Sequence, residues 1–159
     1  MIVEIMPLTE EHRSWARELL IKEWANALCV SRGRAFQADE LPGFVALLDG
    51  QPRGLITYNV EGDQCEIVTM NSLTERQGIG SALIRAVRDF ASSKGCKRLW
   101  LITTNDNTYA FKFYQKLGFS VAAYHKDAMD ESRRLKPSIP LTGMDGIPIK
   151  DEIEFEMML

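Results

Sequence analysis

Residues 77–81, with the sequence Gln-Gly-Ile-Gly-Ser, have the composition of a phosphate-binding turn. They follow an apolar strand-like segment, Ile67 to Met70, and they open a stretch with apolar residues at helical spacing as far as Lys94. Two glycines at a helix start leave the N–H groups of the first turn uncovered, and the helix dipole makes that end positive. The pattern therefore predicts a site for the diphosphate of a nucleotide cofactor.

Two common nucleotide-binding motifs are excluded by the surrounding residues. A dinucleotide fold favours Gly-x-Gly-x-x-Gly, but Leu83 occupies the third glycine position and no acidic residue ends the following strand. A Walker loop requires Gly-Lys-Ser or Gly-Lys-Thr, and the chain has neither. Taken alone, Gly78-x-Gly80 is also compatible with a plain turn between a strand and a helix.

A second motif follows one strand later, over residues 107–119, with the pattern Asn-x-x-Ala-x-x-Phe-Tyr-Gln-Lys-Leu-Gly-Phe. Together the two motifs resemble the GNAT superfamily of N-acetyltransferases, whose core is a glycine-loop helix, a strand and a helix that ends in Tyr-x-x-x-Gly-Phe. The resemblance covers residues 44–119 and extends towards both ends. It implies acetyl-CoA as the cofactor and transfer of its acetyl group to an amine.

The resemblance also implies the fold. A member of this family has a mixed α/β (α+β) fold, in which a mostly antiparallel central sheet of about six to seven strands is flanked by about four helices. Residues 1–159 would then form a single N-acetyltransferase domain.

The cofactor site is implied in the same way. In this family the strand before the loop pairs its backbone with the pantetheine arm, as an added β-strand would. The asparagine of the second motif contacts the cofactor arm, and the same residue is equally well explained as a helix N-cap. The expected cofactor-binding residues are Val68, Met70, Arg76, Gln77, Gly78, Ile79, Gly80, Ser81 and Asn107.

One residue departs from the family pattern. Glu75 occupies a position where the family usually has Arg or Gln, three residues before the first glycine. A carboxylate would repel a diphosphate, so we expect Glu75 to point into solvent and Arg76 to supply the positive charge.

Two residues are candidates for catalysis. The resemblance implies that Tyr114 is the general acid that protonates the departing thiolate, although helical spacing also fits a core aromatic residue. Glu66 is the candidate base, because strict alternation along its strand would put it on one face with Val68 and Met70. The alternative for Glu66 is an ordinary solvent-facing position on the sheet.

The acceptor pocket should lie opposite the cofactor, between the first helical region and the last strands. Its candidate residues are Arg32, Arg34, His125 and the pair Asp151-Glu152. The two carboxylates would favour a cationic amine, whereas the arginines would favour a carboxylate on the substrate. Each of these charges is also compatible with an ordinary surface role.

Hydrophobic periodicity predicts the elements that must position these residues. The first part of the chain is expected to form a strand over Val3 to Met6 and a helix from Thr9 to about Val30. The further predicted strands are residues 44–48, 54–60, 65–70, 98–103, 119–125 and 152–159, and the further helices are residues 79–94 and 107–117.

The segment from Lys126 to Asp151 is the least regular part of the chain. It contains three prolines, two glycines and equal numbers of basic and acidic residues. Residues 127–135 are compatible with a short helix, and the remainder is expected to be a structured loop because a slack loop of this length is unusual in a compact domain. A functional loop and a subunit contact are the two roles left open.

Composition narrows the classes of partner. The formal net charge of −3 and the absence of a long basic run argue against nucleic-acid binding. The scattered cysteines Cys29, Cys65 and Cys96 argue against a disulfide framework, and the spacing of His and Cys predicts no metal site. No apolar stretch is long enough to span a membrane. We therefore expect a cytoplasmic protein, monomeric or homodimeric, with free thiols.

Three functions remain open from the sequence. The first is an acyltransferase that acetylates a primary amine of a small molecule or peptide by direct attack on the thioester. The second is a non-catalytic acyl-CoA sensor or partner-docking module on the same fold. The third is a transferase acting on protein lysines or N-termini, which predicts an open groove rather than a pocket enclosed by residues 126–151.

Overall fold

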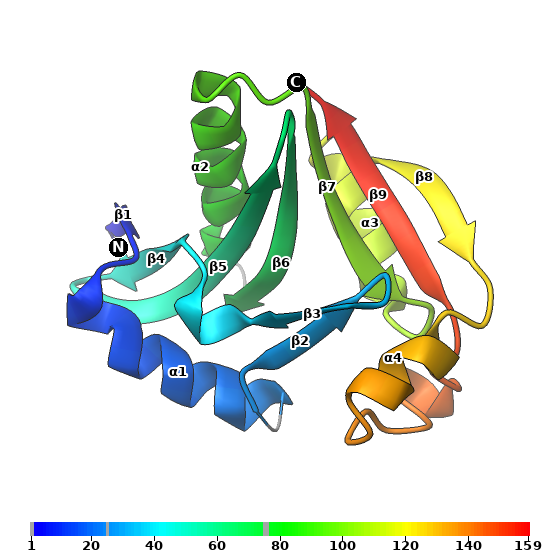
Figure 1. Cartoon of the computed structure of the whole chain (residues 1–159). Coiled ribbons are helices and arrows are strands. Elements are labelled where there is room, and N and C mark those ends of the chain that lie inside the picture. Colours follow the sequence, from blue (N-terminus) through cyan, green and yellow to red (C-terminus); the bar gives the residue numbers. More distant parts are fainter. Residues whose placement is uncertain (1, 25, 75–76) are drawn as a thin grey trace.

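The computed structural model describes residues 2–24, 26–74 and 77–159. In this part of the chain, a seven-stranded sheet has the order β1-β4-β5-β6-β7-β9-β8, and β2 and β3 form a separate hairpin (Figure 1). The strands are β1 (Val3–Pro7), β2 (Leu28–Ser31), β3 (Arg34–Gln37), β4 (Gly43–Leu48), β5 (Gln51–Glu61), β6 (Gln64–Ser72), β7 (Arg98–Thr104), β8 (Ser120–His125) and β9 (Glu152–Met158). The helices are α1 (Glu10–Trp24), α2 (Ile79–Ser93), α3 (Thr108–Lys116) and α4 (Met129–Leu135).

The expected mixed, mostly antiparallel sheet is confirmed. Neighbouring strands of the large sheet are antiparallel at every pairing but one, and the exception is the parallel pair β6–β7. Parallel neighbours need a crossover connection, and α2 provides it. The buried side of α2 carries the apolar residues that the periodicity predicted, among them Ile79, Leu83 and Val87.

The sheet is split between β6 and β7. Residues 64–67 of β6 pair with residues 98–101 of β7, whereas β6 stays paired with β5 as far as Ser72 and β7 with β9 as far as Thr104. Beyond the shared segment the two strands diverge, as Figure 1 shows. The facing backbone edges of β6 and β7 therefore open onto a gap in the middle of the sheet.

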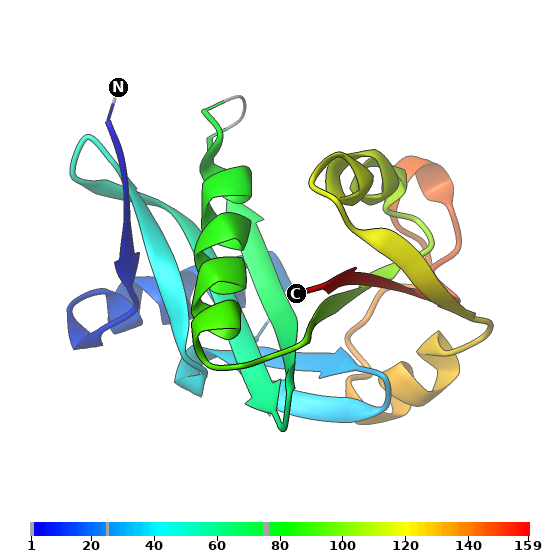
Figure 2. The same ribbon diagram turned by 90° about the horizontal axis from the view of Figure 1, so that it is seen from above.

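Helices cover both faces of the sheet. The larger core joins α2 and α3 to strands on both sides of the split, including Ile67 of β6 and Phe155 of β9. Seen from above, α2 and α3 cover different halves of the sheet, and the end of β9 lies between them (Figure 2). A smaller core joins Leu19 and Leu20 of α1 to Leu55 of β5. Figure 1 shows α3 behind β7 and β9, and the β2–β3 hairpin and α4 in front of the sheet.

The predicted helix from Thr9 to Val30 is wrong in its last part. The helix ends by Trp24, and Leu28–Ser31 forms β2 instead. The reversal is made by Arg32 and Gly33, which both have positive φ (51° and 71°), as the tight turn of a β-hairpin requires. The apolar residues at helical spacing continued into a segment that tertiary contacts hold as a strand.

The segment 126–151 is structured, as expected. The short predicted helix is confirmed as α4. The rest is held by backbone contacts that include an isolated bridge between Thr142 and Pro148 and a 3-10 turn at Met144–Gly146. Arg133 of α4 donates to the carbonyl oxygens of Pro140 and Ile149, so the helix and the following loop form one unit.

Candidate active site

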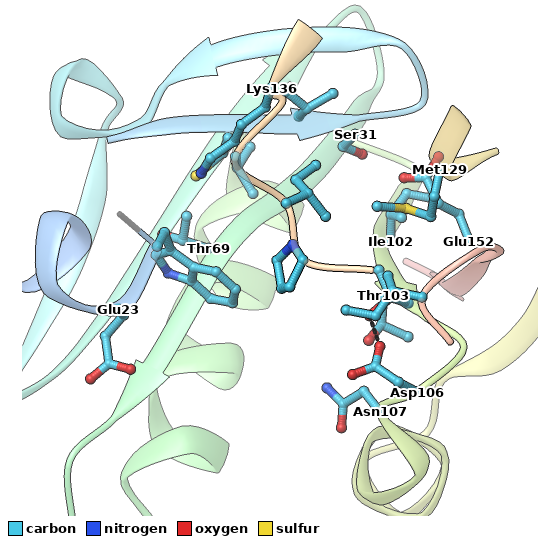
Figure 3. A pocket seen from close by; sticks show the side chains of 18 of the residues that line it. Glu23, Ser31, Thr69, Ile102, Thr103, Asp106, Asn107, Met129, Lys136 and Glu152 are labelled. Carbon is cyan, nitrogen blue, oxygen red and sulfur yellow. Dashed lines mark hydrogen bonds between the residues drawn. The ribbon is translucent and has the colours of Figure 1, made fainter. Parts of the chain in front are cut away.

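A cavity of about 450 Å³ lies where β6 and β7 diverge (Figure 3). Its walls come from both strands, the β2–β3 hairpin, the end of α1 and the segment that contains α4. The lining residues are Glu23, Trp24, Cys29, Val30, Ser31, Glu66, Ile67, Val68, Thr69, Ile102, Thr103, Thr104, Asp106, Asn107, Met129, Lys136, Ser138, Ile139, Pro140, Ile149 and Glu152. The gap in the sheet is therefore a pocket with both apolar and charged walls.

Val68 is the extra residue of a β-bulge at the point where the strands part. Thr69 pairs with Thr57 of β5, and the next pair along the ladder joins Ile67 to Tyr58. Val68 is thus skipped by the β5 register, and the β7 register ends one residue before it. Val68 therefore has no Cα partner in either register, and it lines the cavity at the point where the strands part.

The same bulge overturns the expectation that Glu66 and Met70 share a face. The Glu66 carboxylate bonds to Ser31 and Arg34 of the hairpin, whereas the Met70 side chain packs with the core that contains α2. Because the bulge adds one residue, it reverses the alternation of side chains between these two positions. Met70 can therefore contribute to the cavity side only through its backbone.

The start of α2 offers free backbone donors close to the split. Gly78 is the N-cap, with φ of 72°, and no described side chain caps the first turn. The N–H groups of the first turn, from Ile79 to Ser81, are therefore available to an anion. Gln77 directly precedes this turn.

The two glycines of the turn meet different surroundings. A Cβ at Gly80 would lie 3.2 Å from the ring of Phe113, so α2 and α3 approach each other closely here. A Cβ at Gly78 would meet no atom of the described residues within 4 Å, so those residues leave space in front of the helix terminus. The predicted contributions of Arg76 and Glu75 lie outside the described residues.

Asn107 has the local role that its position predicted. It is the N-cap of α3, and its Oδ1 accepts a hydrogen bond from the N–H of Ala110 at 3.3 Å. It also lines the cavity, next to Asp106 in Figure 3. The cap uses the oxygen of the side chain and leaves its NH₂ group available, so the contact with a cofactor arm stays a prediction.

Glu66 is not the solvent-facing residue of the alternative interpretation, because only 2% of it is exposed. Ser31 Oγ donates to its Oε2 at 2.8 Å, and Arg34 Nη2 donates to its Oε1. Burial raises the pKa of this carboxyl, and the hydrogen bond from Ser31 and the charge of Arg34 oppose that shift. Glu66 also borders a second, polar cavity of about 260 Å³. A carboxyl of raised pKa between two cavities is suited to accept and pass on a proton.

Glu152 is the second buried carboxylate of the site, with 2% of its surface exposed. Its Oε2 accepts a long hydrogen bond of 3.4 Å from the backbone N–H of Arg32, and its Oε1 is buried without a hydrogen-bond partner among the described residues. Burial raises the pKa of Glu152 as well. Its charge is near enough to Glu66 to contribute to the raised pKa of that residue.

The other expected acceptor residues are engaged elsewhere and do not line the main cavity. Arg34 pairs with Glu61 and Glu66, and the Arg32 guanidinium lies 3.8 Å from Glu154. His125 Nε2 lies 3.0 Å from the same Glu154. Asp151 accepts hydrogen bonds from the Tyr124 hydroxyl and the N–H of Asp127, so it holds the entry to α4 in place.

Tyr114 lies in an aromatic cluster and is not among the residues that line the cavity. Its ring centroid lies 5.1 Å from that of Phe113 and 5.6 Å from those of Phe119 and Phe155. Burial raises the pKa of its hydroxyl to about 12, so the group stays protonated at neutral pH. The structure brings Glu66, Val68 and Asn107 to one cavity, and the role of Tyr114 stays a prediction.

Ser31 and Lys136 are among the lining residues that the sequence analysis did not propose for the site. Ser31 reaches the cavity as part of the β2–β3 hairpin, and the sequence feature that indicates this hairpin is the turn at Arg32-Gly33. Lys136 is buried, and its Nζ donates to the carbonyl oxygen of Leu28 at 2.6 Å. No local sequence pattern distinguishes Lys136 from a surface lysine, because its environment is made by a distant strand.

The structure also describes the state of the cysteines and allows a search for metal-binding groups and membrane-spanning helices. Cys29, Cys65 and Cys96 are free, and the last two are buried. Among residues 2–24, 26–74 and 77–159, no three His, Cys, Asp or Glu side chains are grouped so that they could hold a metal ion. No helix in those ranges combines the length and the apolar character needed to cross a bilayer.

Comparisons with known proteins agree with this architecture. Residues 5–119 match the model of the acetyltransferase (GNAT) family. The uncharacterised protein YdhI of Bacillus subtilis (strain 168) is 40% identical over 156 residues, which are 98% of each chain.

Two further proteins carry informative names. An aminoglycoside N(6')-acetyltransferase type 1 of Salmonella typhimurium is 32% identical over 95 residues, which are 52% of this chain and 65% of that one. A GNAT family acetyltransferase from Elizabethkingia anophelis, solved with acetyl-CoA bound, superposes with a TM-score of 0.71 at 21% identity, over 99% of this chain and 98% of that one. The chain described here belongs to the GNAT family of acetyltransferases.

Proposed function

We propose that the protein transfers the acetyl group of acetyl-CoA to a primary amine of a small molecule or peptide. The observation that carries this proposal is the cavity at the split sheet, which is lined by both the bulge residue Val68 and the buried carboxylate of Glu66. The acetyl-CoA complex of the Elizabethkingia relative supports the choice of cofactor. The aminoglycoside acetyltransferase among the relatives supports an amine acceptor.

The residues present fit acetyl-CoA. The free N–H groups at the start of α2 suit its diphosphate, and the open backbone edge of β6 at Val68 and Met70 suits its pantetheine arm. When bound, acetyl-CoA supplies a thioester whose acetyl carbon the amine attacks directly, so that a C–N bond forms and the C–S bond breaks. The N–H of Val68 is then available to hold the carbonyl oxygen as negative charge develops on it.

Glu66 serves as the base in this proposal. An alkyl amine has a pKa of about 10 and must lose a proton before it can attack. Glu66 takes that proton directly or through water, and the polar cavity on its other side gives the proton a route to solvent. The raised pKa of Glu66 brings it nearer to neutral pH, where a base works best.

No acyl-cysteine is needed. Cys29 lines the cavity, but burial raises the pKa of its thiol and keeps it protonated. Burial likewise raises the pKa of Cys65, to about 12. Tyr114, with its protonated hydroxyl, is the proposed donor to the departing thiolate.

A small acceptor is favoured over a folded protein. Part of the cavity wall is built by residues that follow α4, among them Ser138, Ile139 and Pro140. A lysine on a protein surface would need an open groove at this segment. Because the segment lines the cavity instead, a small acceptor fits better.

The test is an assay of thiol release with acetyl-CoA and a panel of amines, combined with calorimetry of CoA binding. We expect CoA to bind and at least one amine to release free thiol. Binding of CoA without thiol release from any amine would support the non-catalytic sensor instead. Absence of any association with CoA would refute both functions.

A further inference from the structure

We infer that the acceptor carries a second cationic group besides the amine that is acetylated, and that Glu152 binds this second group. The inference rests on the proposed function and adds the substrate class. It starts from Glu152 Oε1, which is buried at the cavity with no hydrogen-bond partner among the described residues. The other oxygen of Glu152 has only the long bond from the N–H of Arg32.

The charges of Arg32 and His125 lower the pKa of Glu152 but are outweighed by burial, and neither side chain forms an ion pair with Glu152 in the described structure. The side chains of Arg32 and His125 both lie against Glu154, two residues further along β9. Lys136 is the cationic side chain among the lining residues, and its ammonium is bonded to the Leu28 carbonyl.

The remaining carboxylates of the cavity differ from Glu152. Both oxygens of Glu66 accept hydrogen bonds, one of them from Arg34. Asp106 accepts from the hydroxyl of Thr104 and from the N–H of Met144. Glu23 is exposed at the other side of the cavity from Glu152 in Figure 3. Glu152 is therefore the buried carboxylate of the lining with an oxygen that has no hydrogen-bond partner among the described residues.

A buried carboxylate is tolerated when it is protonated or paired with a cation. An ammonium or guanidinium on the acceptor would supply that pair, whereas a neutral or anionic substituent would leave Oε1 unpaired. Glu66 is on β6 and Glu152 on β9, so the two carboxylates belong to opposite sides of the split sheet. This arrangement fits an acceptor with two cationic ends. One end loses its proton near Glu66 and is acetylated, and the other stays charged at Glu152.

The experiment compares α,ω-diamines of increasing chain length with the monoamine of the same carbon count. For the best length we expect kcat/KM with acetyl-CoA to be about tenfold to a hundredfold higher for the diamine, mainly through KM, because a charged hydrogen-bonded pair is gained. This comparison needs only the unmodified protein.

Two substitutions assign the preference to a residue. Glu152→Gln should bring the kcat/KM of the diamine close to that of the monoamine, mainly by raising the KM of the diamine, as the loss of a binding contact would. Glu156→Gln, on the same strand but paired with Arg98 and outside the cavity lining, should retain the preference. Binding of diamine and monoamine to the CoA-loaded protein, measured by calorimetry, gives a second readout that needs no turnover.

The outcomes separate the two proposals. Thiol release from monoamines and diamines with equal kcat/KM at every length would overturn this inference and leave the proposed function standing. Selective diamine binding that Glu152→Gln abolishes, without thiol release from any amine, would overturn the proposed function and retain the role of Glu152. A diamine preference that survives in Glu152→Gln would also overturn the inference.

Discussion

At the scale of single residues, the Tyr114 hydroxyl can be tested apart from cofactor binding. Tyr114→Phe removes one oxygen from a ring that is held by three aromatic neighbours, so the core should stay packed. If the hydroxyl protonates the thiolate, kcat should fall by about 10²-fold or more while CoA affinity is unchanged. Steady-state kinetics and calorimetry on the same preparation measure both quantities.

The matched control is Tyr109→Phe in the same helix. Tyr109 is 65% exposed and stacks on Phe113, so its hydroxyl is in water. This variant should keep the kcat of the unmodified protein. Equal kcat for Tyr114→Phe and the unmodified protein across all accepted amines would remove Tyr114 from the mechanism.

Glu152 also makes a prediction about stability. Because burial raises its pKa in the folded state, the penalty on its charged form is absent below the ordinary carboxyl pKa of about 4.3, grows as pH rises from there towards the folded pKa, and is complete above it. Glu152→Gln has no such penalty. Its free energy of unfolding should exceed that of the unmodified protein by about 1 kcal/mol near pH 7, and the difference should shrink towards pH 4.

Urea unfolding at the two pH values measures this difference. Glu156→Gln serves as the control, since it loses an ion pair with Arg98 and should not gain stability at neutral pH. The opposite result would be a stability advantage of Glu152→Gln over the unmodified protein that is smaller near pH 7 than near pH 4. That result would contradict a buried, unpaired carboxylate at this position.

At the scale of elements, the bulge in β6 predicts that the N–H of Val68 can be removed without unfolding the sheet. Val68 has no Cα partner in the β5 or β7 register, so Val68→Pro acts at the bulge rather than at a regularly paired position. If this N–H holds the carbonyl oxygen, kcat should fall by about 10²–10³-fold. Val68→Ala keeps the N–H and should keep most of the activity. Circular dichroism checks the fold, and equal kcat for the two variants would assign no role to the N–H.

The start of α2 gives a second prediction at this scale. Gly78 and Gly50 both have positive φ (72° and 82°), and a Cβ at either would meet no atom within 4 Å in the part of the chain that the structure describes. Replacement by Ala should cost about 1–2 kcal/mol of stability at each site, because both enter the left-handed region. Only Gly78→Ala should also weaken CoA binding, since its methyl group enters the space in front of the helix terminus. If both variants bound CoA with equal affinity, the proposed binding of the diphosphate at this turn would be wrong.

The elements also show what sequence patterns can and cannot predict. The two motifs predicted α2, α3 and the strands around them because local periodicity and turn residues determine those elements. The hairpin β2–β3 was missed because apolar spacing from Trp15 to Leu28 continued past the end of α1. Arg32-Gly33 follows directly on the predicted helix, and a left-handed pair at that position is the turn of a hairpin.

At the scale of the whole molecule, the cavity could be predicted only in part. Ser31, Glu66 and Glu152 are far apart in the sequence, and the hairpin and the order β7-β9 bring them together. Glu66 and Glu152 were candidates because of their charge and position on predicted strands. Their burial, and the bond from Ser31 to Glu66, follow from packing that no local pattern records.

The split sheet leads to the last prediction. The two halves are joined along β6–β7 by residues 64–67 and 98–101 alone, and the cores under α2 and α3 meet across that short seam. A ligand that binds both the start of α2 and the cavity should therefore stabilise the molecule as a whole. At about a hundred times its Kd, CoA should raise Tm by roughly 5–10 °C.

Pantetheine, which lacks the diphosphate, is the control for this effect and should raise Tm much less at the same concentration. Hydrogen exchange locates the stabilisation: protection should increase at residues 68–72 of β6, whose edge faces the gap, more than at residues 43–48 of β4, which pair on both sides. If CoA slowed exchange in β4 but left exchange in β6 unchanged, CoA would bind outside the split, because a ligand lying along β6 covers that open edge first.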